Sequence, residues 1–392
     1  MKTKRSFALI AVTVLLLSVC FSYACKRIEP HSSTEKTYET LSGNVEEISK
    51  YGNVKITTRK DEMAEKGYEF GDIVTVSFAD KSVDMPYCGT YSDVDAGTAG
   101  LFGRPDDEVL TVAVNVGNFA TIYGIADKVT KEDDSYEWVY RDGVDSSVTF
   151  KISMREKRGY YNEYVLRQLF YSDLRSDYPD LSDEQFGNFR AVSTTGIKQN
   201  VLYRSATPVD PQKNRNVYVD AAAKQHGITV VIDLNDSEES LAGFESFETS
   251  YVATIDHIAL NMGLDFTEDD FKNKLRDGLK YMSEHEGVYL VHCLEGKDRT
   301  GFVIALLEFL TGASYEEAED DYMMTYFNYY GVKKGDEKYD IIATSNFEKN
   351  LLRSFNVSDV KNADLIKLAT DYIKAIGLTD QEIATLKSHL VA

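Results

Sequence analysis

The chain has 392 residues, with 43 Lys and Arg against 64 Asp and Glu, so its formal net charge is −21. This length suits two domains with sizeable cores. The acidic balance argues against nucleic acid as a main partner, because nucleic-acid-binding domains carry a basic footprint. It also argues against binding of an anionic membrane through the whole surface. Four scattered cysteines are too few for a disulfide scaffold or a zinc module: Cys20, Cys25, Cys88 and Cys293.

The first 24 residues have the pattern of an export signal. Lys2, Lys4 and Arg5 precede an apolar stretch that runs to Val19, and residues 22–24 form a small-x-small cleavage pattern. An uncleaved membrane helix is the alternative, because the stretch approaches the roughly 18–20 apolar residues that span a bilayer. We predict a signal peptide at residues 1–24 and a mature chain that works outside the cytoplasm.

Cys25 directly follows the small residue Ala24. This arrangement resembles the lipobox of bacterial lipoproteins, which implies a lipid anchor on Cys25, although Ser22 stands where Leu is usual. Several acyl chains on one residue would make such an anchor stable. A lipoprotein and a freely secreted protein both remain open. Residues 25–39 are predicted to be a tether, and we expect contact with a membrane only through the anchor.

Residues 40–155 are predicted to form a mainly-β domain of unknown role. Its segments are rich in β-branched residues in alternating patterns, and turn residues separate them. This pattern predicts a small barrel or sandwich. The segments are Val54–Thr58, Ile73–Phe78, Val109–Val114 and Ser147–Ile152.

Residues 156–392 show the alternation of strands and helices that is typical of an α/β fold. Two continuous apolar runs predict strands buried in a mostly parallel sheet, and apolar residues at helical spacing predict helices that flank it. The strands are expected at 229–234 and 288–291, and the helices at 160–174, 271–286, 301–310 and 315–328.

One segment between a predicted strand and helix carries the chemistry, with Cys293 and Arg299 in a Cys-x5-Arg pattern. The loop between them can turn its backbone N–H groups into one cup, and a helix that starts there adds an anion site. Arg299 supplies a planar donor that matches phosphate oxygens. Gly296 permits the turn. The loop residues expected to bind phosphate are Leu294, Glu295, Gly296, Lys297 and Asp298.

Cys293 is predicted to be the nucleophile of this loop. Helix N-termini and nearby cations favour the thiolate form of a cysteine, which can attack a bound phosphate and form a cysteinyl-phosphate. Thr300 is expected to donate a hydrogen bond to the sulfur, and His292 is expected to orient the loop. A buried Cys after a strand is more often a small apolar residue. The conjunction of His, Cys, Gly, Arg and Thr-Gly favours the phosphatase loop.

The segment resembles the loop of the bacterial tyrosine/serine protein phosphatases, His-Cys-x-x-Gly-Lys-Asp-Arg-Thr-Gly, within the cysteine-dependent phosphatase superfamily. Asn188–Arg190, Leu202–Ser205 and Val231–Leu234 match further family motifs, and the resemblance covers 186–392. It implies hydrolysis of phosphate monoesters without a metal or other cofactor. The Lys-Asp pair is associated with tolerance of phosphoinositides. Asn235 departs from the family, which usually has Arg there.

Several Asp residues are candidates for the general acid that protonates the leaving group. The family places an Asp a few residues beyond the strand that follows the Ile-Asp-Leu motif, which makes Asp265 the first candidate and a helix cap the alternative. Asp298 is the second candidate, followed by Asp256 and Asp269. Two further basic side chains are expected to line the pocket or to form structural ion pairs, Arg190 and Arg204.

These observations predict an exported, cysteine-dependent protein tyrosine phosphatase, or one of dual tyrosine and serine specificity, that acts on a phosphorylated protein. A phosphatase for phosphoinositides or inositol phosphates is the alternative enzyme. A surface module that captures phosphorylated ligands is the alternative outside enzymes, and a rhodanese-like sulfur transferase is a third reading. The intact Cys293, Arg299 and Thr300 favour hydrolysis, because a module that only binds has no need of a thiolate.

Overall fold

The computed structural model describes residues 37–133 and 135–391. The predicted signal peptide at 1–24, the lipidation candidate Cys25 and most of the predicted tether lie outside the described residues. Within the described ranges, no helix has both the length and the hydropathy that a membrane span requires.

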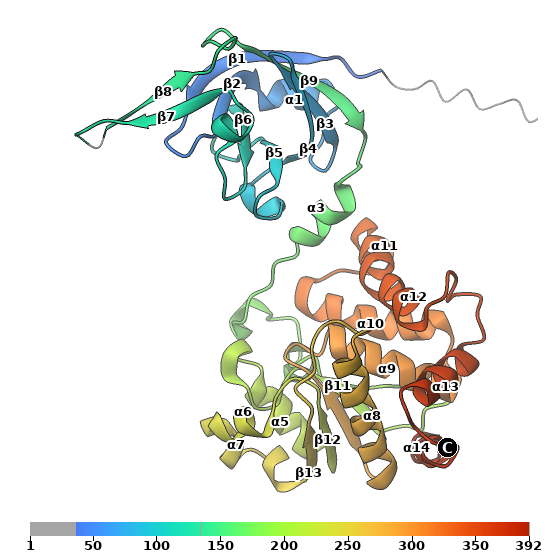
Figure 1. The fold of residues 1–392 in the computed structure, drawn as a ribbon. Coiled ribbons are helices and arrows are strands. Elements are labelled where there is room, and N and C mark those ends of the chain that lie inside the picture. The colour runs from blue at the N-terminus through green and yellow to red at the C-terminus, as the bar shows by residue number, and fades with distance from the viewer. Residues whose placement is uncertain (1–36, 134, 392) are drawn as a thin grey trace, which may run out of the picture. The chain divides into compact units, whose positions relative to one another are not determined.

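Seven strands close into a barrel in the order β1-β2-β6-β5-β4-β3-β9 (Figure 1). Neighbouring strands are antiparallel except for β4 and β5, which are parallel. The barrel strands are β1 (Leu41–Ile48), β2 (Val54–Arg59), β3 (Ile73–Phe78), β4 (Lys81–Cys88), β5 (Ala99–Phe102), β6 (Val109–Val114) and β9 (Thr149–Glu156).

Alternate residues are buried in β2, β3 and the first half of β9. In β3, Val74, Val76 and Phe78 are buried, whereas the residues between them are half-buried. This period of two is what the sequence pattern predicts for a strand with one face in a core. Two short helices, α1 (Lys60–Glu65) and α2 (Phe119–Ile122), lie between the strands in sequence, and β7 (Ala126–Thr130) and β8 (Tyr136–Tyr140) form a separate hairpin.

A second sheet has five strands in the order β10-β11-β14-β12-β13. The pair β10 and β11 is antiparallel, and the other three pairs are parallel. The strands are β10 (Arg190–Ala191), β11 (Leu202–Ser205), β12 (Val230–Asp233), β13 (Asp256–Ala259) and β14 (Tyr289–His292).

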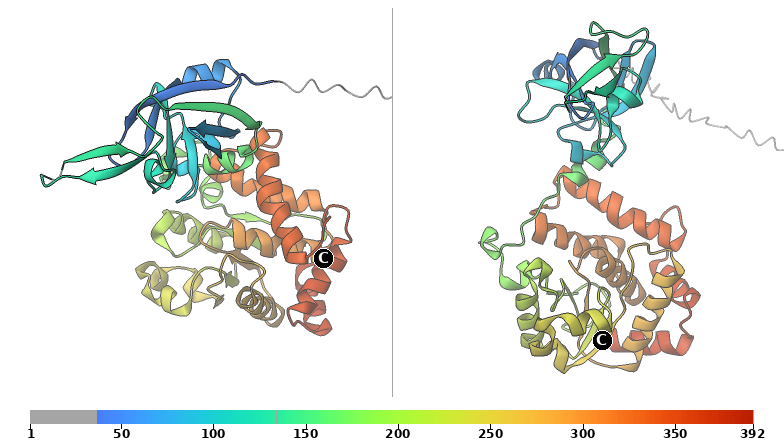
Figure 2. Two further views of the ribbon diagram at one scale, coloured as in Figure 1. Left: turned by 45° about the horizontal axis from the view of Figure 1, so that its top comes forward. Right: turned by 60° about the vertical axis from the view of Figure 1, so that its left-hand side comes forward.

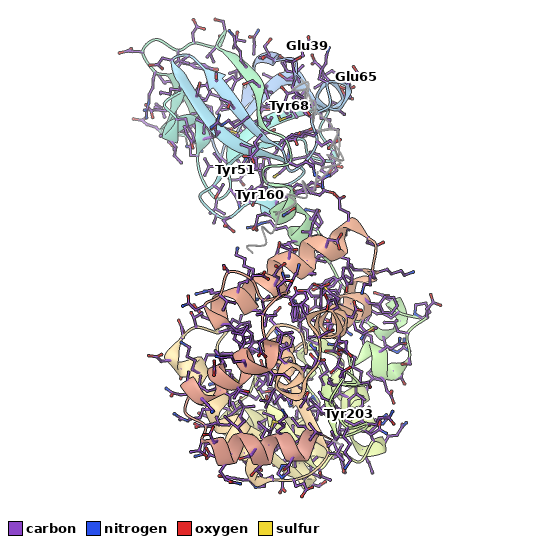
Figure 3. All side chains as sticks on the ribbon, turned by 90° about the vertical axis from the view of Figure 1, so that its right-hand side faces the viewer. Glu39, Tyr51, Glu65, Tyr68, Tyr160 and Tyr203 are labelled. Carbon is purple, nitrogen blue, oxygen red and sulfur yellow. The ribbon has the colours of Figure 1, made fainter. Side chains whose placement is uncertain are left out.

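Successive residues of the central strands enter opposite hydrophobic cores, one on each face of this sheet. Leu290 on β14 and Tyr203 on β11, which is labelled in Figure 3, pack with helix α5 (Asn216–Gln225). Tyr289 and Val291 pack on the other face with the apolar side chains of the remaining large helices. Figure 2 shows these helices from two further directions. Burial on both faces explains why the strands have continuous apolar sequences.

The helices of this second core are α8 (Asp269–Glu284), α9 (Asp298–Thr311), α10 (Tyr315–Tyr330), α12 (Lys349–Phe355), α13 (Leu365–Ala375) and α14 (Asp380–Leu390), with α11 (Glu337–Ile342) and a π-helical turn at Ala343–Glu348 before α12. The shorter helices are α4 (Asp183–Phe186), α6 (Glu238–Gly243) and α7 (Glu245–Thr249). The prediction of a mixed α/β protein is confirmed. The proposed domain boundaries at 39/40 and 155/156 remain predictions.

The helix expected at 160–174 is wrong in its second half, because α3 covers only Tyr161–Arg167. Beyond it, tertiary contacts take the place of helical hydrogen bonds. The amide of Ser172 donates to the hydroxyl of Tyr178, and its carbonyl accepts from that hydroxyl and from Arg215 Nη2. The apolar residues of 160–174 do have helical spacing, but the residues after α3 contact side chains outside this segment.

Candidate active site

The Cys-x5-Arg segment lies at the carboxyl ends of the parallel strands of the second sheet. β14 ends at His292, Cys293 follows, and α9 begins at Asp298. β14 lies between β11 and β12, at the centre of the sheet. The side chain of Cys293 is 3% exposed and is a free thiol. The thiol therefore lies between the end of a buried strand and the start of a buried helix.

Two loop carbonyls are held by buried side chains from distant parts of the chain. The Asn188 side-chain amide donates to the carbonyls of Glu295 (3.0 Å) and Gly296 (3.3 Å). The Tyr329 hydroxyl donates to the same Glu295 carbonyl at 3.0 Å, and Arg204 Nη2 donates to the Gly296 carbonyl at 2.9 Å. These contacts fix the orientation of the loop peptides.

A third loop carbonyl, that of Leu294, accepts the amide of Thr207 at 3.2 Å. In a trans peptide the C=O and the following N–H point in opposite directions. Three carbonyls that point away from the loop therefore turn the N–H groups of residues 295–297 toward its concave side. The free N–H groups of the first turn of α9 and the positive end of its dipole add to the same concave surface. This arrangement has the donors that an anion site requires.

Gly296 is required by this close packing. Its φ is +67°, and an added Cβ would lie 2.1 Å from the carbonyl oxygen of Ser205. Both the left-handed backbone and the contact exclude a side chain. The close approach brings the loop against β11, where Arg204 reaches the Gly296 carbonyl.

Arg299 keeps two of its five N–H donors free. Nη1 donates to the carbonyls of Leu234 (3.2 Å) and Met262 (2.9 Å), and Nη2 donates to the Asn235 side-chain oxygen at 2.8 Å. Nε is buried and has no acceptor within the described residues. Nε and the second Nη2 proton form the edge that binds a phosphate in a two-pronged manner. The guanidinium is thus oriented before an anion arrives.

Thr300 and His292 flank the reactive groups. Thr300 is fully buried and its hydroxyl has no partner among the described residues, so it is available to a ligand or to the sulfur. Burial lowers the pKa of His292 to about 4, so the ring is neutral near pH 7. Its Nδ1 lies 3.8 Å from Asp233 Oδ1, beyond hydrogen-bond distance.

Arg204 and Arg190 lie behind the loop and form structural ion pairs, which was one of the two roles expected for them. Arg204 is fully buried and pairs with Asp321 of α10. Arg190 donates from Nε to Asp321 at 2.9 Å and from Nη1 to the Asn188 side-chain oxygen at 2.8 Å. Arg190 thereby orients Asn188, which in turn holds two loop carbonyls.

Asp298 and Asp265 have contrasting environments. Burial raises the pKa of Asp298, against the lowering effect of Lys297, whose Nζ lies 3.9 Å away. Asp298 borders a cavity of about 320 Å³ that Tyr330 and Asn346 also line. Thr267 and Arg353 lower the pKa of Asp265, which accepts the Thr267 amide at 3.0 Å. Each retains the role of a predicted general acid.

The two remaining acid candidates, Asp256 on β13 and Asp269 in the first turn of α8, are both exposed. Within the described residues, no group of three or more His, Cys, Asp and Glu side chains is arranged to hold a metal ion.

Several residues that shape the loop were not predicted from the sequence. Tyr329 lies on α10, and Tyr329, Tyr171 and Lys213 all lie outside the sequence motifs. Tyr171 donates to the Glu295 carboxylate, and Lys213 Nζ lies 3.9 Å from it. Asn188 could have been found from the sequence, because it begins the Asn-Phe-Arg motif.

The part of the chain that contains this loop matches a known protein family. A family model described as the tyrosine phosphatase family matches residues 185–392. No curated protein matches the chain. Solved structures that match include an uncharacterized conserved protein from Thermotoga maritima, with 21% identity and a TM-score of 0.23; the match covers 29% of this chain and 36% of that one. The chain thus spans about a third of that protein's length.

Two further structures that match are phosphatase domains. One is the core catalytic domain of the PP-IP phosphatase SIW14 from S. cerevisiae, with 19% identity and a TM-score of 0.25, covering 43% of this chain and 96% of that one. The other is the Yvh1 phosphatase domain from Chaetomium thermophilum, with 14% identity and a TM-score of 0.20, covering 50% and 94%.

Proposed function

The chain belongs to the tyrosine phosphatase family, and from this premise we propose that it hydrolyses phosphotyrosine in proteins through a cysteinyl-phosphate on Cys293. One observation carries the proposal. The loop carbonyls point outward, which leaves inward N–H groups and the free edge of Arg299 around a buried, unpaired thiol. A phosphate monoester has the charge and the oxygen geometry that this cup accepts.

In the first step, the Cys293 thiolate attacks phosphorus in line with the ester bond. The S–P bond forms, the P–O bond to the tyrosine oxygen breaks, and a carboxylic acid gives that oxygen its proton. In the second step, water attacks phosphorus, the S–P bond breaks, and the same carboxylate takes up the proton of the water. The unpartnered Thr300 hydroxyl can donate to the sulfur as it leaves.

We assign the general acid to Asp298 ahead of Asp265. A general acid must be protonated before the first step, and burial raises the pKa of Asp298, whereas Thr267 and Arg353 lower that of Asp265. Asp298 also lies at the start of α9, between Lys297 and Arg299. Asp265 stays the alternative acid.

The test is phosphate release by the purified protein with a chelator present, run beside Cys293→Ser. The substrates are peptides carrying phosphotyrosine, phosphoserine or phosphothreonine, a phosphoinositide set and inositol hexakisphosphate. We expect chelator-resistant turnover of phosphotyrosine that Cys293→Ser abolishes. Turnover of phosphoinositides alone would replace the protein substrate with the alternative. Binding of phosphate analogues without turnover of any ester would contradict an enzyme.

Export to the cell surface is a second part of the proposal, and it is supported by the sequence of residues 1–25 alone. A cleaved chain that begins at Cys25 and carries a lipid would fractionate with membranes, and Cys25→Ser would release it. A chain that remains in the cytoplasm with its first 24 residues attached would contradict export.

A further inference from the structure

A cluster of four side chains surrounds Glu295, two residues after the nucleophile. Lys297 Nζ donates to Glu295 Oε2 at 2.7 Å, and the Tyr171 hydroxyl donates to Oε1. Lys213 Nζ lies 3.9 Å from the same Oε1. We call Tyr171, Lys213, Glu295 and Lys297 the Glu295 cluster. Tyr171 precedes the region that the family model matches, so part of this cluster comes from outside that region.

Glu295 and Lys297 are both charged at neutral pH. Burial raises the pKa of Glu295, but Lys297, Tyr171 and Lys213 outweigh it, so the net pKa lies below its usual range. Burial lowers the pKa of Lys297, but neighbouring Asp298 and Glu295 raise it well above the usual value. The three charged side chains of the cluster are only 17–20% exposed, which limits their screening by solvent.

Both lysines of the cluster lie against Glu295. Lys297 Nζ lies 2.7 Å from its carboxylate, and Lys213 Nζ lies 3.9 Å from that carboxylate and from Asp173. Neither lysine therefore has an uncompensated charge to offer to a second anionic group of a substrate.

Two cations on α12 and α8 are also paired with carboxylates. Arg353 pairs with Asp265 at 2.9 Å, and Lys274 pairs with Asp270 at 2.9 Å. A substrate with a single phosphate needs only the loop amides and Arg299. A compact substrate with several phosphates needs cations around the loop, where Lys213 and Lys297 are paired with Glu295.

We propose that Glu295 is a specificity residue that restricts this site to substrates with a single phosphate, such as a phosphorylated tyrosine side chain, and disfavours rings that carry several phosphates. This inference rests on the proposed phosphatase activity and narrows its substrate class. The carboxylate acts by neutralising Lys213 and Lys297 and by repelling an additional phosphate, so its removal should widen the specificity.

The test compares the native protein with Glu295→Gln, which keeps the shape of the side chain and removes its charge. The kcat/KM for inositol hexakisphosphate relative to that for a phosphotyrosine peptide is expected to rise about tenfold, because one like charge is removed at a half-buried position. Glu286→Gln is the matched control. Glu286 is exposed in the loop that precedes β14, at the opposite end of that strand, and its substitution should leave the ratio unchanged.

A binding measurement keeps the inference testable without turnover. In a Cys293→Ser background, the affinity for inositol hexakisphosphate should increase about tenfold with Glu295→Gln, and adding Lys213→Met should cancel most of the increase. An unchanged substrate ratio or an unchanged affinity in Glu295→Gln would overturn the inference. Absence of turnover of every ester by the native protein would overturn the proposed function instead, and the affinity series would still decide the role of Glu295.

Discussion

The guanidinium of Arg299 and the side-chain amide of Asn235 form a direct hydrogen bond, in which Nη2 donates to Oδ1 at 2.8 Å. Asn235 stands where the family usually has Arg, so this chain has an acceptor where the family has a further cation. The bond, together with the carbonyls of Leu234 and Met262, leaves only the Nε edge of Arg299 free for an anion.

We therefore expect Asn235→Ala to impair catalysis rather than folding. A hydrogen bond to a charged group contributes about 1.5–3 kcal/mol, so kcat/KM for a phosphotyrosine peptide should fall about tenfold or more. Asn235 is half-buried and is held in the turn by its own amide, so the thermal midpoint should change little. Unchanged kcat/KM in a folded variant would show that the two remaining acceptors suffice to orient Arg299.

Gly296 in the loop and Gly331 after α10 form a matched pair for substitution by alanine. Gly296 and Gly331 have nearly the same backbone angle, φ +67° and +68°, but a Cβ at 296 would meet a backbone oxygen at 2.1 Å, whereas one at 331 would meet nothing within 4 Å. Gly331→Ala should cost only about 1 kcal/mol of stability for the left-handed conformation. Gly296→Ala should in addition displace the loop and abolish measurable phosphatase activity.

Both variants would be compared by chemical denaturation and by turnover of a phosphotyrosine peptide. Equal losses of stability, with activity kept in Gly296→Ala, would mean that the loop accommodates a side chain beside Ser205 and is less rigid than its packing indicates.

Local patterns were sufficient to predict the strand, the loop and the helix that make the site. The apolar runs at 229–234 and 288–291 correspond to β12 and β14, because a strand that is buried on both faces has a continuous apolar sequence. Helix α9 begins at Asp298, three residues before the expected Gly301, because its first turn carries polar site residues in place of apolar ones. The apolar pattern therefore missed the start of the helix, because the residues of the site there are polar.

The supports of the loop were not predictable in the same way. Asn188 and Tyr329 contact the carbonyl of Glu295 across 107 and 34 positions of the chain. Such contacts depend on how the sheet and α10 pack, and no spacing along the sequence encodes them. Asn188 also has a φ of +52°, a conformation that Asn tolerates better than most residues.

The general acid can be identified from pH profiles of two matched variants. Burial raises the pKa of Asp298, so the protonated acid persists to higher pH, and activity should fall as pH rises through that pKa. Asp298→Asn should lower kcat on phosphotyrosine by about 10²-fold and remove this alkaline limb. Asp265→Asn should do neither, because the lowered pKa of Asp265 keeps that carboxyl ionised.

Aryl phosphates with increasingly good leaving groups provide the check. A leaving group that needs no proton should restore much of the activity of Asp298→Asn. Loss of the alkaline limb in Asp265→Asn, with Asp298→Asn retaining it, would return the role to Asp265.

Asp233 makes the stability of the fold depend on pH. Its Oδ1 accepts the amides of Asn235 (2.8 Å) and Asp236 (3.0 Å), whereas its Oδ2 is buried without a partner in the described part of the chain. Burial raises the pKa of Asp233 from about 3.8 to about 6, against the lowering effect of the two amides. The folded state therefore favours the protonated carboxyl more than the unfolded state does.

The pH dependence of stability follows from this difference in pKa between the folded and unfolded states. A carboxyl with a raised pKa contributes stability that is fully present below the unfolded value near 3.8 and is lost as pH rises through about 6. About two pKa units correspond to an upper limit of roughly 3 kcal/mol. His292 acts in the opposite direction, because burial lowers its pKa to about 4 and its contribution is lost as pH falls. Asp233→Asn retains His292, so the difference between variant and native protein isolates Asp233.

We expect Asp233→Asn to gain stability relative to the native protein between pH 4 and pH 7, by roughly 2–3 kcal/mol. Denaturant unfolding of both proteins at several pH values, with the phosphatase part followed by its own spectroscopic signal, measures this difference. The Asn side chain keeps an oxygen for the amides of residues 235 and 236, so the turn that carries Asn235 to Arg299 should persist, and activity at pH 6 reports on it. A difference in stability that does not vary with pH would mean that Asp233 titrates alike in the folded and unfolded chain, and that its unpartnered oxygen reaches water.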